Sequence, residues 1–203
     1  MSTELQRRYT LEQYLDLDRA SEVRYEYWDG EVFAMSGASP QHDQIFINLV
    51  ASLRTQLRGR PCRVFSSDMR LKVPSLPPYR YPDLSALCGE PHFELIGGLQ
   101  ALTNPSLIIE ILSPTTEAFD RGDKFTHYKS IPEFSEYLLV AQHRPHFGHY
   151  LRQDDGSWNY REVNELTVSL HLFSIDCVLA LDEVYQDVEF KPQVGIGNSE
   201  RAL

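Results

Sequence analysis

Apolar side chains follow a helical period through the longest patterned stretch of the chain. They recur every four residues over residues 41–58, at Ile45, Leu49, Leu53 and Leu57. This spacing predicts an amphipathic helix that packs on a sheet. Ser39 and Pro40 precede the stretch and are residue types that favour the N-cap and the first helical position. Further helices are expected over residues 9–18, capped by Thr10, over residues 115–130, and near residues 177–185.

Short runs rich in β-branched and aromatic residues fill much of the remaining chain and predict strands. Asp29-Gly30 separates two such runs and favours a hairpin, whereas the proline-rich residues 74–80 favour a loop. Strands interspersed with helices indicate an α/β or α+β fold, with a central mixed sheet flanked by helices. The expected strands cover residues 23–28, 31–35, 62–66, 69–73, 84–87, 106–112, 136–140, 146–152, 157–163 and 167–172.

Length and composition narrow the class of protein. The chain has 203 residues, which predicts a single domain over residues 1–190 and a flexible polar tail over 191–203. It has no apolar run long enough to cross a membrane and no signal-peptide core near its N-terminus, so we expect a soluble cytoplasmic protein. Cys62, Cys88 and Cys177 form no CxxC pair, which argues against a zinc ribbon or a disulfide framework.

The charge balance bears on nucleic-acid binding. The formal net charge is −10, whereas proteins that grip a long stretch of duplex usually carry a basic face. If nucleic acid is the substrate, we expect a local footprint, or metal ions that supply much of the positive charge.

One carboxylate lies inside an apolar run that reads as a buried strand. Glu110 interrupts the segment LIIEIL, and Asp83 directly precedes a second apolar strand, in YPDLSALC. A buried charge is costly unless it is paired or binds a metal. Two acids on separate core strands therefore suggest a site for a hard divalent cation. The alternative is that Asp83 caps a turn after Pro82 and that Glu110 pairs with a cation in the core.

These acids also carry a resemblance to a known family. The segments YEYWDGEVFAMSGASPQH, RYPDLSAL and LIIEILSPTTEAFDRGDKFTHY resemble the Uma-two family of restriction endonucleases, within the PD-(D/E)XK nuclease superfamily, over about residues 10–185. The resemblance implies a restriction-endonuclease-like core, with Asp83 and Glu110 as ligands of Mg²⁺ or Mn²⁺. It also implies a metal-dependent endonuclease that cleaves a phosphodiester bond, most plausibly in DNA, and a homodimer, since duplex cleavage needs two sites.

The chain departs from the superfamily pattern at the lysine. The superfamily carries a catalytic lysine two residues after the strand glutamate, where this chain has Leu112. Lys124 is the expected replacement, because Asp120, Lys124 and Tyr128 share one stripe of the following helix. The Uma-two pattern resembles this spacing of acid, lysine and aromatic residue. The alternative is an exposed Asp120–Lys124 ion pair worth a few tenths of a kcal/mol.

Two further residues match family positions. His42 lies in the first turn of its helix, where it would contact phosphate or act as a base, unless it merely bonds a loop carbonyl. Glu31 follows the Asp29-Gly30 turn and would assist the metal site, although an exposed strand glutamate needs no function. His143, His146 and His149 are not expected to bind zinc, because Pro145 prevents a helix and odd spacing on a strand separates two of them.

Two rival functions follow from the same residues. Leu112 and the net charge of −10 also fit a catalytically idle descendant that serves as a binding or assembly module. The lack of a basic face also fits a hydrolase of a small or non-DNA phosphodiester. Metal titration separates the first rival from the nuclease, and a panel of substrates that includes RNA and single strands separates the second.

Overall fold

The computed structural model describes residues 8–190, apart from residues 22, 24, 29, 35–37, 76–78 and 97. The expected tail over residues 191–203 and the expected turn residue Asp29 lie outside the described part of the chain. The helical elements of the described chain are α1 (Leu11–Ala20), α2 (Pro40–Gln56), α3 (Glu117–Phe119), the π-helical turn η1 (Asp120–Lys124), α4 (Phe125–Tyr128) and α5 (Leu181–Val184).

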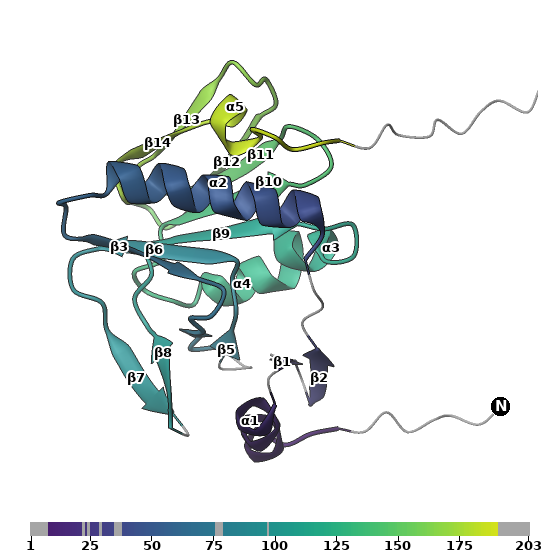
Figure 1. Ribbon diagram of the computed structural model, residues 1–203. Helices are drawn as coiled ribbons and strands as arrows, with labels where there is room; N and C mark the ends of the chain where they lie inside the picture. The colour runs from purple at the N-terminus through teal and green to yellow at the C-terminus, as the bar shows by residue number, and fades with distance from the viewer. Residues whose placement is uncertain are drawn as a thin grey trace, which may run out of the picture.

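A six-stranded mixed sheet forms the centre of the fold (Figure 1). Only the β9–β10 pair is parallel within this sheet, and its other neighbours are antiparallel. The fold is therefore mixed α+β with a central mixed sheet, as the sequence predicts. Across the sheet the strands run β12 (Trp158–Val163), β11 (Phe147–Arg152), β10 (Glu136–Ala141), β9 (Leu107–Leu112), β6 (Leu84–Cys88) and β3 (Cys62–Ser66).

Smaller sheets surround this centre. A four-stranded sheet has the order β5 (Tyr79–Arg80), β4 (Leu71–Lys72), β8 (Leu99–Leu102) and β7 (Phe93–Ile96). Two separate hairpins are β1 (Tyr25–Trp28) with β2 (Glu31–Ala34), and β13 (Ser169–Leu172) with β14 (Cys177–Ala180). The antiparallel pairing of β1 with β2 confirms the predicted hairpin.

Helix α2 lies across one face of the sheet, and α4 lies on the other face (Figure 1). Ile45, Leu49 and Leu53 of α2 are fully buried and pack with Ile109 and Ile111 of β9. Ser39 caps the helix through a hydrogen bond to the His42 backbone N–H, and Pro40 is its first residue. The predicted stripe and cap are both confirmed.

Strand β9 is buried along its whole length, and its alternating residues serve the two faces. Leu107, Ile109 and Ile111 face the α2 core. Ile108 and Leu112 join a second core that contains Phe125 and Tyr128 of α4. Glu110 lies between Ile108 and Leu112 in the same alternation, so its side chain faces α4.

The secondary structure differs from the expectation in three places. The helix expected over residues 115–130 is present from Glu117 to Tyr128, but its middle turn, Asp120–Lys124, is π-helical. The helix expected near residues 177–185 begins as strand β14, which pairs with β13, and only Leu181–Val184 is helical. The β7–β8 hairpin was not expected at all.

The cysteines also differ from expectation. Cys62 and Cys88 form a disulfide, while Cys177 is free and buried. The two bonded residues are direct partners in the antiparallel register of β3 and β6, with their Cα atoms 3.9 Å apart. Because strand register brings together residues 26 positions apart in sequence, the spacing of the cysteines gave no sign of this pairing.

Candidate active site

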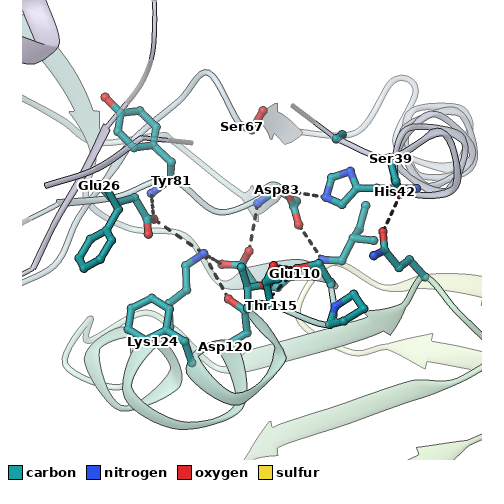
Figure 2. Close-up of a pocket in the computed structure, with 18 of the residues that line it drawn as sticks. Glu26, Ser39, His42, Ser67, Tyr81, Asp83, Glu110, Thr115, Asp120 and Lys124 are labelled. Carbon is teal, nitrogen blue, oxygen red and sulfur yellow. Dashed lines mark hydrogen bonds and ion pairs between the residues drawn. The ribbon is translucent and has the colours of Figure 1, made fainter. Parts of the chain in front are cut away.

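A cleft of about 780 Å³ opens where the start of α2, the start of β6 and the end of β9 meet the α3–α4 segment. Hydroxyl side chains from the loop after β9 line one part of it, and carboxylates line another. Its charged and imidazole side chains are Glu26, His42, Asp83, Glu110, Asp120 and Lys124. These residues come from segments far apart in the sequence and point toward one another (Figure 2).

Asp83 connects the two core strands. One of its carboxylate oxygens, Oδ2, accepts a hydrogen bond of 2.6 Å from the Ile111 backbone N–H. In return, the Asp83 backbone N–H donates to Glu110 Oε2 at 3.4 Å. The other oxygen, Oδ1, lies 3.2 Å from His42 Nε2. Asp83 is therefore held between β9 and α2, and Pro82 before it restrains the approach of the backbone to β6.

Glu110 is almost completely buried, with 2% of its surface exposed. Its Oε1 accepts hydrogen bonds from Tyr128 Oη at 2.8 Å and from Lys124 Nζ at 2.9 Å. Burial raises the pKa of this carboxyl well above its ordinary value, and Asp120 and Asp83 raise it further, while Lys124 opposes them. The alternative considered from the sequence, a pairing of Glu110 with a core cation, is thus present, and Glu110 also lines the cleft.

Lys124 is surrounded by three carboxylates. Its Nζ lies 2.9 Å from Glu110 Oε1, 3.5 Å from Asp120 Oδ1 and 3.8 Å from Glu26 Oε1. Burial alone would lower the pKa of Lys124, but these three acids outweigh it and hold the pKa well above the ordinary value. Lys124 is therefore an ammonium ion at neutral pH. The predicted stripe of Asp120, Lys124 and Tyr128 exists, but it is buried rather than an exposed ion pair.

The π-helical turn η1 carries both Asp120 and Lys124, which are its buried residues. Turns of this kind are rare and occur frequently at functional sites. Burial raises the pKa of Asp120, against the effect of Lys124. The Asp120 backbone carbonyl accepts a hydrogen bond of 3.0 Å from Tyr137 Oη, so strand β10 supports the turn from below.

The position of Leu112 explains why the lysine is on the helix. Leu112 is fully buried in the core that contains Phe125 and Tyr137. A lysine there would have to place its ammonium group among aromatic rings. Lys124 reaches Glu110 from the helical segment that covers this face of the sheet, and its Nζ lies 2.9 Å from the carboxylate that the superfamily lysine would neighbour.

His42 faces the same cleft from the first turn of α2. Burial lowers the pKa of its imidazole, but the hydrogen bond and charge of Asp83 outweigh burial and leave the pKa above its ordinary value. Its Nδ1 is buried and has no hydrogen-bond partner among the described residues. The structure thus brings together four of the five residues that the sequence nominated: Asp83, Glu110, Lys124 and His42.

Glu31 is the fifth, and the structure does not place it among the residues that line the cleft. It starts β2 opposite Trp28. The acid that the hairpin contributes is instead Glu26 of β1, which also accepts a hydrogen bond of 3.3 Å from the Tyr81 backbone N–H. Sequence reasoning missed Glu26, because the choice between Glu26 and Glu31 depends on how the β1–β2 hairpin docks against Tyr81.

The histidine group lies away from the cleft. His149 Nε2 contacts Glu136 Oε1 at 2.6 Å, whereas His146 contacts Asn164 and Arg121. Among the residues described by the structure, no three His, Cys, Asp or Glu side chains form a metal-binding group. Of the described helices, none is long and apolar enough to span a membrane.

The cleft nevertheless suits a cation that needs few protein ligands. Magnesium keeps several waters and takes one or two carboxylates together with substrate phosphate oxygens, so it needs no cage of three side chains. Glu110 Oε2 has one long contact, with the Asp83 N–H at 3.4 Å, and carboxylate oxygens can accept more than one partner. Asp120 and Asp83 also place negative charge beside Glu110, which a divalent cation would relieve.

Comparison with known proteins identifies the family of the chain. A family model named Uma2, described as "Putative restriction endonuclease", matches residues 11–182. The chain belongs to the Uma2 family. Two uncharacterized proteins of Synechocystis are similar to it: slr1290 is 34% identical over 88% of this chain and 92% of its own length, and sll1609 is 35% identical over 76% and 86%.

A solved structure shares the fold of this Uma2 chain. It is described as a "putative nuclease belonging to DUF820" from Anabaena variabilis, and the superposition has a TM-score of 0.65 with 18% sequence identity. The match covers 85% of this chain and 97% of the other. At that identity the likeness establishes the nuclease-like fold, and the chemistry of this Uma2 protein has to be argued from its own residues.

Proposed function

We propose that this protein is a metal-dependent phosphodiesterase, and specifically an endonuclease that cleaves DNA. One observation carries the proposal: Asp83, Glu110 and Lys124 come from three separate segments and meet in one cleft. The Asp83 N–H contacts Glu110 at 3.4 Å, and Lys124 contacts Glu110 at 2.9 Å. Membership of a family described by its restriction-endonuclease likeness supports the reaction class.

Asp83 and Glu110 would hold Mg²⁺ or Mn²⁺ in this proposal. Once bound, the metal would supply Lewis-acid stabilisation of the phosphoryl group and a more acidic water. Both carboxylates are fixed before any ligand arrives, Asp83 by the Ile111 N–H and Glu110 by Tyr128. Fixed ligands of this kind reduce the reorganisation needed at the reacting centre.

Lys124 would act as a cation rather than as a base. Its raised pKa keeps it protonated at neutral pH, so it cannot remove a proton from water. Its ammonium group can donate to a phosphoryl oxygen and stabilise the charge that develops there. His42 would contact phosphate from the first turn of α2, since Asp83 raises the pKa of its imidazole and so favours the protonated form.

The proposal includes a homodimer in the cytoplasm, because cleavage of both strands of a duplex needs two sites. A nicking assay on supercoiled plasmid, with Mg²⁺ or Mn²⁺, tests the activity. The variants are Glu110→Gln and Lys124→Ala, with Lys72→Ala as a matched control, since Lys72 pairs with Glu94 outside the cleft. Wild type and Lys72→Ala should nick the plasmid, and both cleft variants should lose at least a hundredfold in rate.

Other outcomes lead to other functions. Loss in Glu110→Gln alone would keep the carboxylate site and remove Lys124 from the mechanism. Absence of cleavage by wild type with either metal, together with no Mn²⁺ binding by calorimetry, would identify an idle binding module. Mn²⁺ binding without DNA cleavage would direct the search to RNA, single strands and small phosphodiesters.

A further inference from the structure

A second hollow lies at the other end of α2 and is lined by arginines. Its volume is about 390 Å³, and Arg54, Arg58 and Arg60 line it together with Thr55 and Cys62. No carboxylate is among its lining residues. Residues 44–67 contain four arginines and no aspartate or glutamate, within a chain whose formal net charge is −10. Positive charge is thus concentrated in one short segment.

Two of these arginines are uncommitted. Arg54 and Arg58 are exposed, and neither makes an ion pair or a hydrogen bond with any residue that the structure describes. Other cations of the described chain form ion pairs, as Arg19 does with Asp16 and Arg121 does with Glu117. The positive charges of Arg54 and Arg58 are therefore available to a binding partner.

Hydrogen bonds hold the third arginine, Arg60, in a fixed position at the hollow. Arg60 Nη2 donates to the Ile175 carbonyl at 2.7 Å, and its Nη1 donates to the Asp176 carbonyl at 2.8 Å. Asp176 lies 3.9 Å from Arg60 Nη2 and is largely exposed, so it offsets only part of this charge. Gly59, with φ of +77°, turns the chain from the end of α2 toward Arg60.

We propose that Arg54, Arg58 and Arg60 form a second nucleic-acid contact, which binds backbone phosphates away from the cleavage cleft. The choice of ligand rests on the proposed function. The cleft itself holds four carboxylates, Glu26, Asp83, Glu110 and Asp120, so it repels a polyanion until cations bind. Arginine suits phosphate through its planar fork of donors, and phosphate contacts supply most of the affinity for duplex DNA.

Helix geometry separates the two contacts. Arg54 follows His42 by twelve residues in α2, which places it roughly 18 Å further along the axis and about 120° around it. The arginines therefore hold a different stretch of backbone from the one that would enter the cleft. A simpler reading is that arginines at a helix C-terminus only stabilise the helix dipole, by about 0.3–1 kcal/mol. That reading predicts a change in stability and none in DNA binding.

Fluorescence anisotropy with a labelled 30-base-pair duplex in EDTA tests the proposal without any cleavage. Arg54→Ala/Arg58→Ala should bind the duplex at least tenfold more weakly. The slope of log K against log salt should become shallower by roughly 1.8, since each lost phosphate contact removes about 0.9. Arg54→Lys/Arg58→Lys should retain the salt slope. Arg63→Ala is the matched control, because Arg63 is exposed, makes no ion pair with any residue that the structure describes, and does not line the hollow.

The outcomes separate this contact from the catalytic proposal. Wild-type affinity of the double alanine variant for the duplex would overturn the proposed second contact. An equal loss of affinity in Arg63→Ala would also overturn it, because the loss would then reflect only the net charge of the protein. The proposed contact would also be overturned if inorganic phosphate at millimolar concentration displaced the duplex. Tighter binding of a polyglutamate peptide than of the duplex, dependent on Arg54 and Arg58, would overturn it as well. If Arg54→Ala/Arg58→Ala loses binding while wild type never nicks plasmid, the second contact stands and the nuclease proposal fails.

Discussion

Replacing Glu110 by glutamine tests whether this buried acid is kept for chemistry or for stability. Glutamine keeps the shape and one acceptor, so Tyr128 and Lys124 can still donate to it. The change removes one charge from a buried group that also contains Lys124 and Asp120. At 2.9 Å and an effective dielectric constant of 20, the lost Lys124–Glu110 attraction is about 6 kcal/mol.

Two effects oppose that loss. Desolvation of a buried carboxylate costs several kcal/mol, and Asp83 and Asp120 repel the Glu110 charge. Their sum exceeds the attraction to Lys124, because the pKa of Glu110 is raised well above the ordinary value of 4.5. A raised folded-state pKa means that stability present below pH 4.5 is lost as the pH rises through the folded-state value. Each unit of the rise corresponds to about 1.4 kcal/mol.

We therefore expect Glu110→Gln to be at least as stable as wild type at pH 8, and to lose that advantage toward pH 4. Urea unfolding followed by circular dichroism at several pH values measures this difference. A loss of more than about 3 kcal/mol at pH 8 would refute the reasoning and make the Glu110–Lys124 pair a structural clamp. Mn²⁺ affinity, measured on the same samples, should fall at least tenfold.

Glu136→Gln is the matched control, because Glu136 is equally buried but its pKa is lowered. Burial raises that pKa, and hydrogen bonds from His149 and Ser174 outweigh it. The stability from a lowered folded-state pKa is present above pH 4.5 and is lost as the pH falls through the folded-state value. Glu136→Gln should therefore cost roughly 3 kcal/mol at pH 8, and the cost should shrink in acid, which is the opposite pH dependence.

Three further predictions concern the neighbours of the cleft and the sheet. Tyr128→Phe should lower the free energy of unfolding by about 1–2 kcal/mol in urea titrations, because Glu110 loses a buried donor. An unchanged free energy of unfolding would show that this hydrogen bond does not stabilise the fold. Asp83→Asn should lower the His42 pKa, as followed by NMR, since burial would then be opposed only by the charges of Asp43 and Asp120. Cys62→Ala/Cys88→Ala should cost up to about 3.5 kcal/mol under oxidising conditions, from the entropy of a 26-residue loop, and nothing under reducing conditions.

The sequence predicted those parts of the molecule whose determinants are local. The α2 stripe, its Ser39 cap, the turn after Trp28 and the buried strand around Glu110 all follow from patterns within a few residues. The strand register that joins Cys62 to Cys88 is set by long-range pairing, and no local pattern encodes it. The same limit applies to β14, since CVLA becomes a strand only because β13 lies beside it.

The candidate site divides in the same way. Asp83, Glu110, Lys124 and His42 could be nominated because each stands out from its own segment or matches a family spacing. Glu26 could not be ranked above Glu31, because the choice depends on how the β1–β2 hairpin docks against Tyr81. The π-helical turn is equally hidden, since Asp120–Lys124 has the composition of an ordinary helical turn.

The docking of that hairpin makes the cleft a composite of two separately packed parts of the chain. Glu26 reaches Lys124 from β1, and the hairpin and α1 rest on a small core of their own, built around Tyr14, Tyr79 and Ala101. Undocking of this small core would withdraw one of the three carboxylates around Lys124, while Asp83 and Glu110 would stay in place on the central sheet.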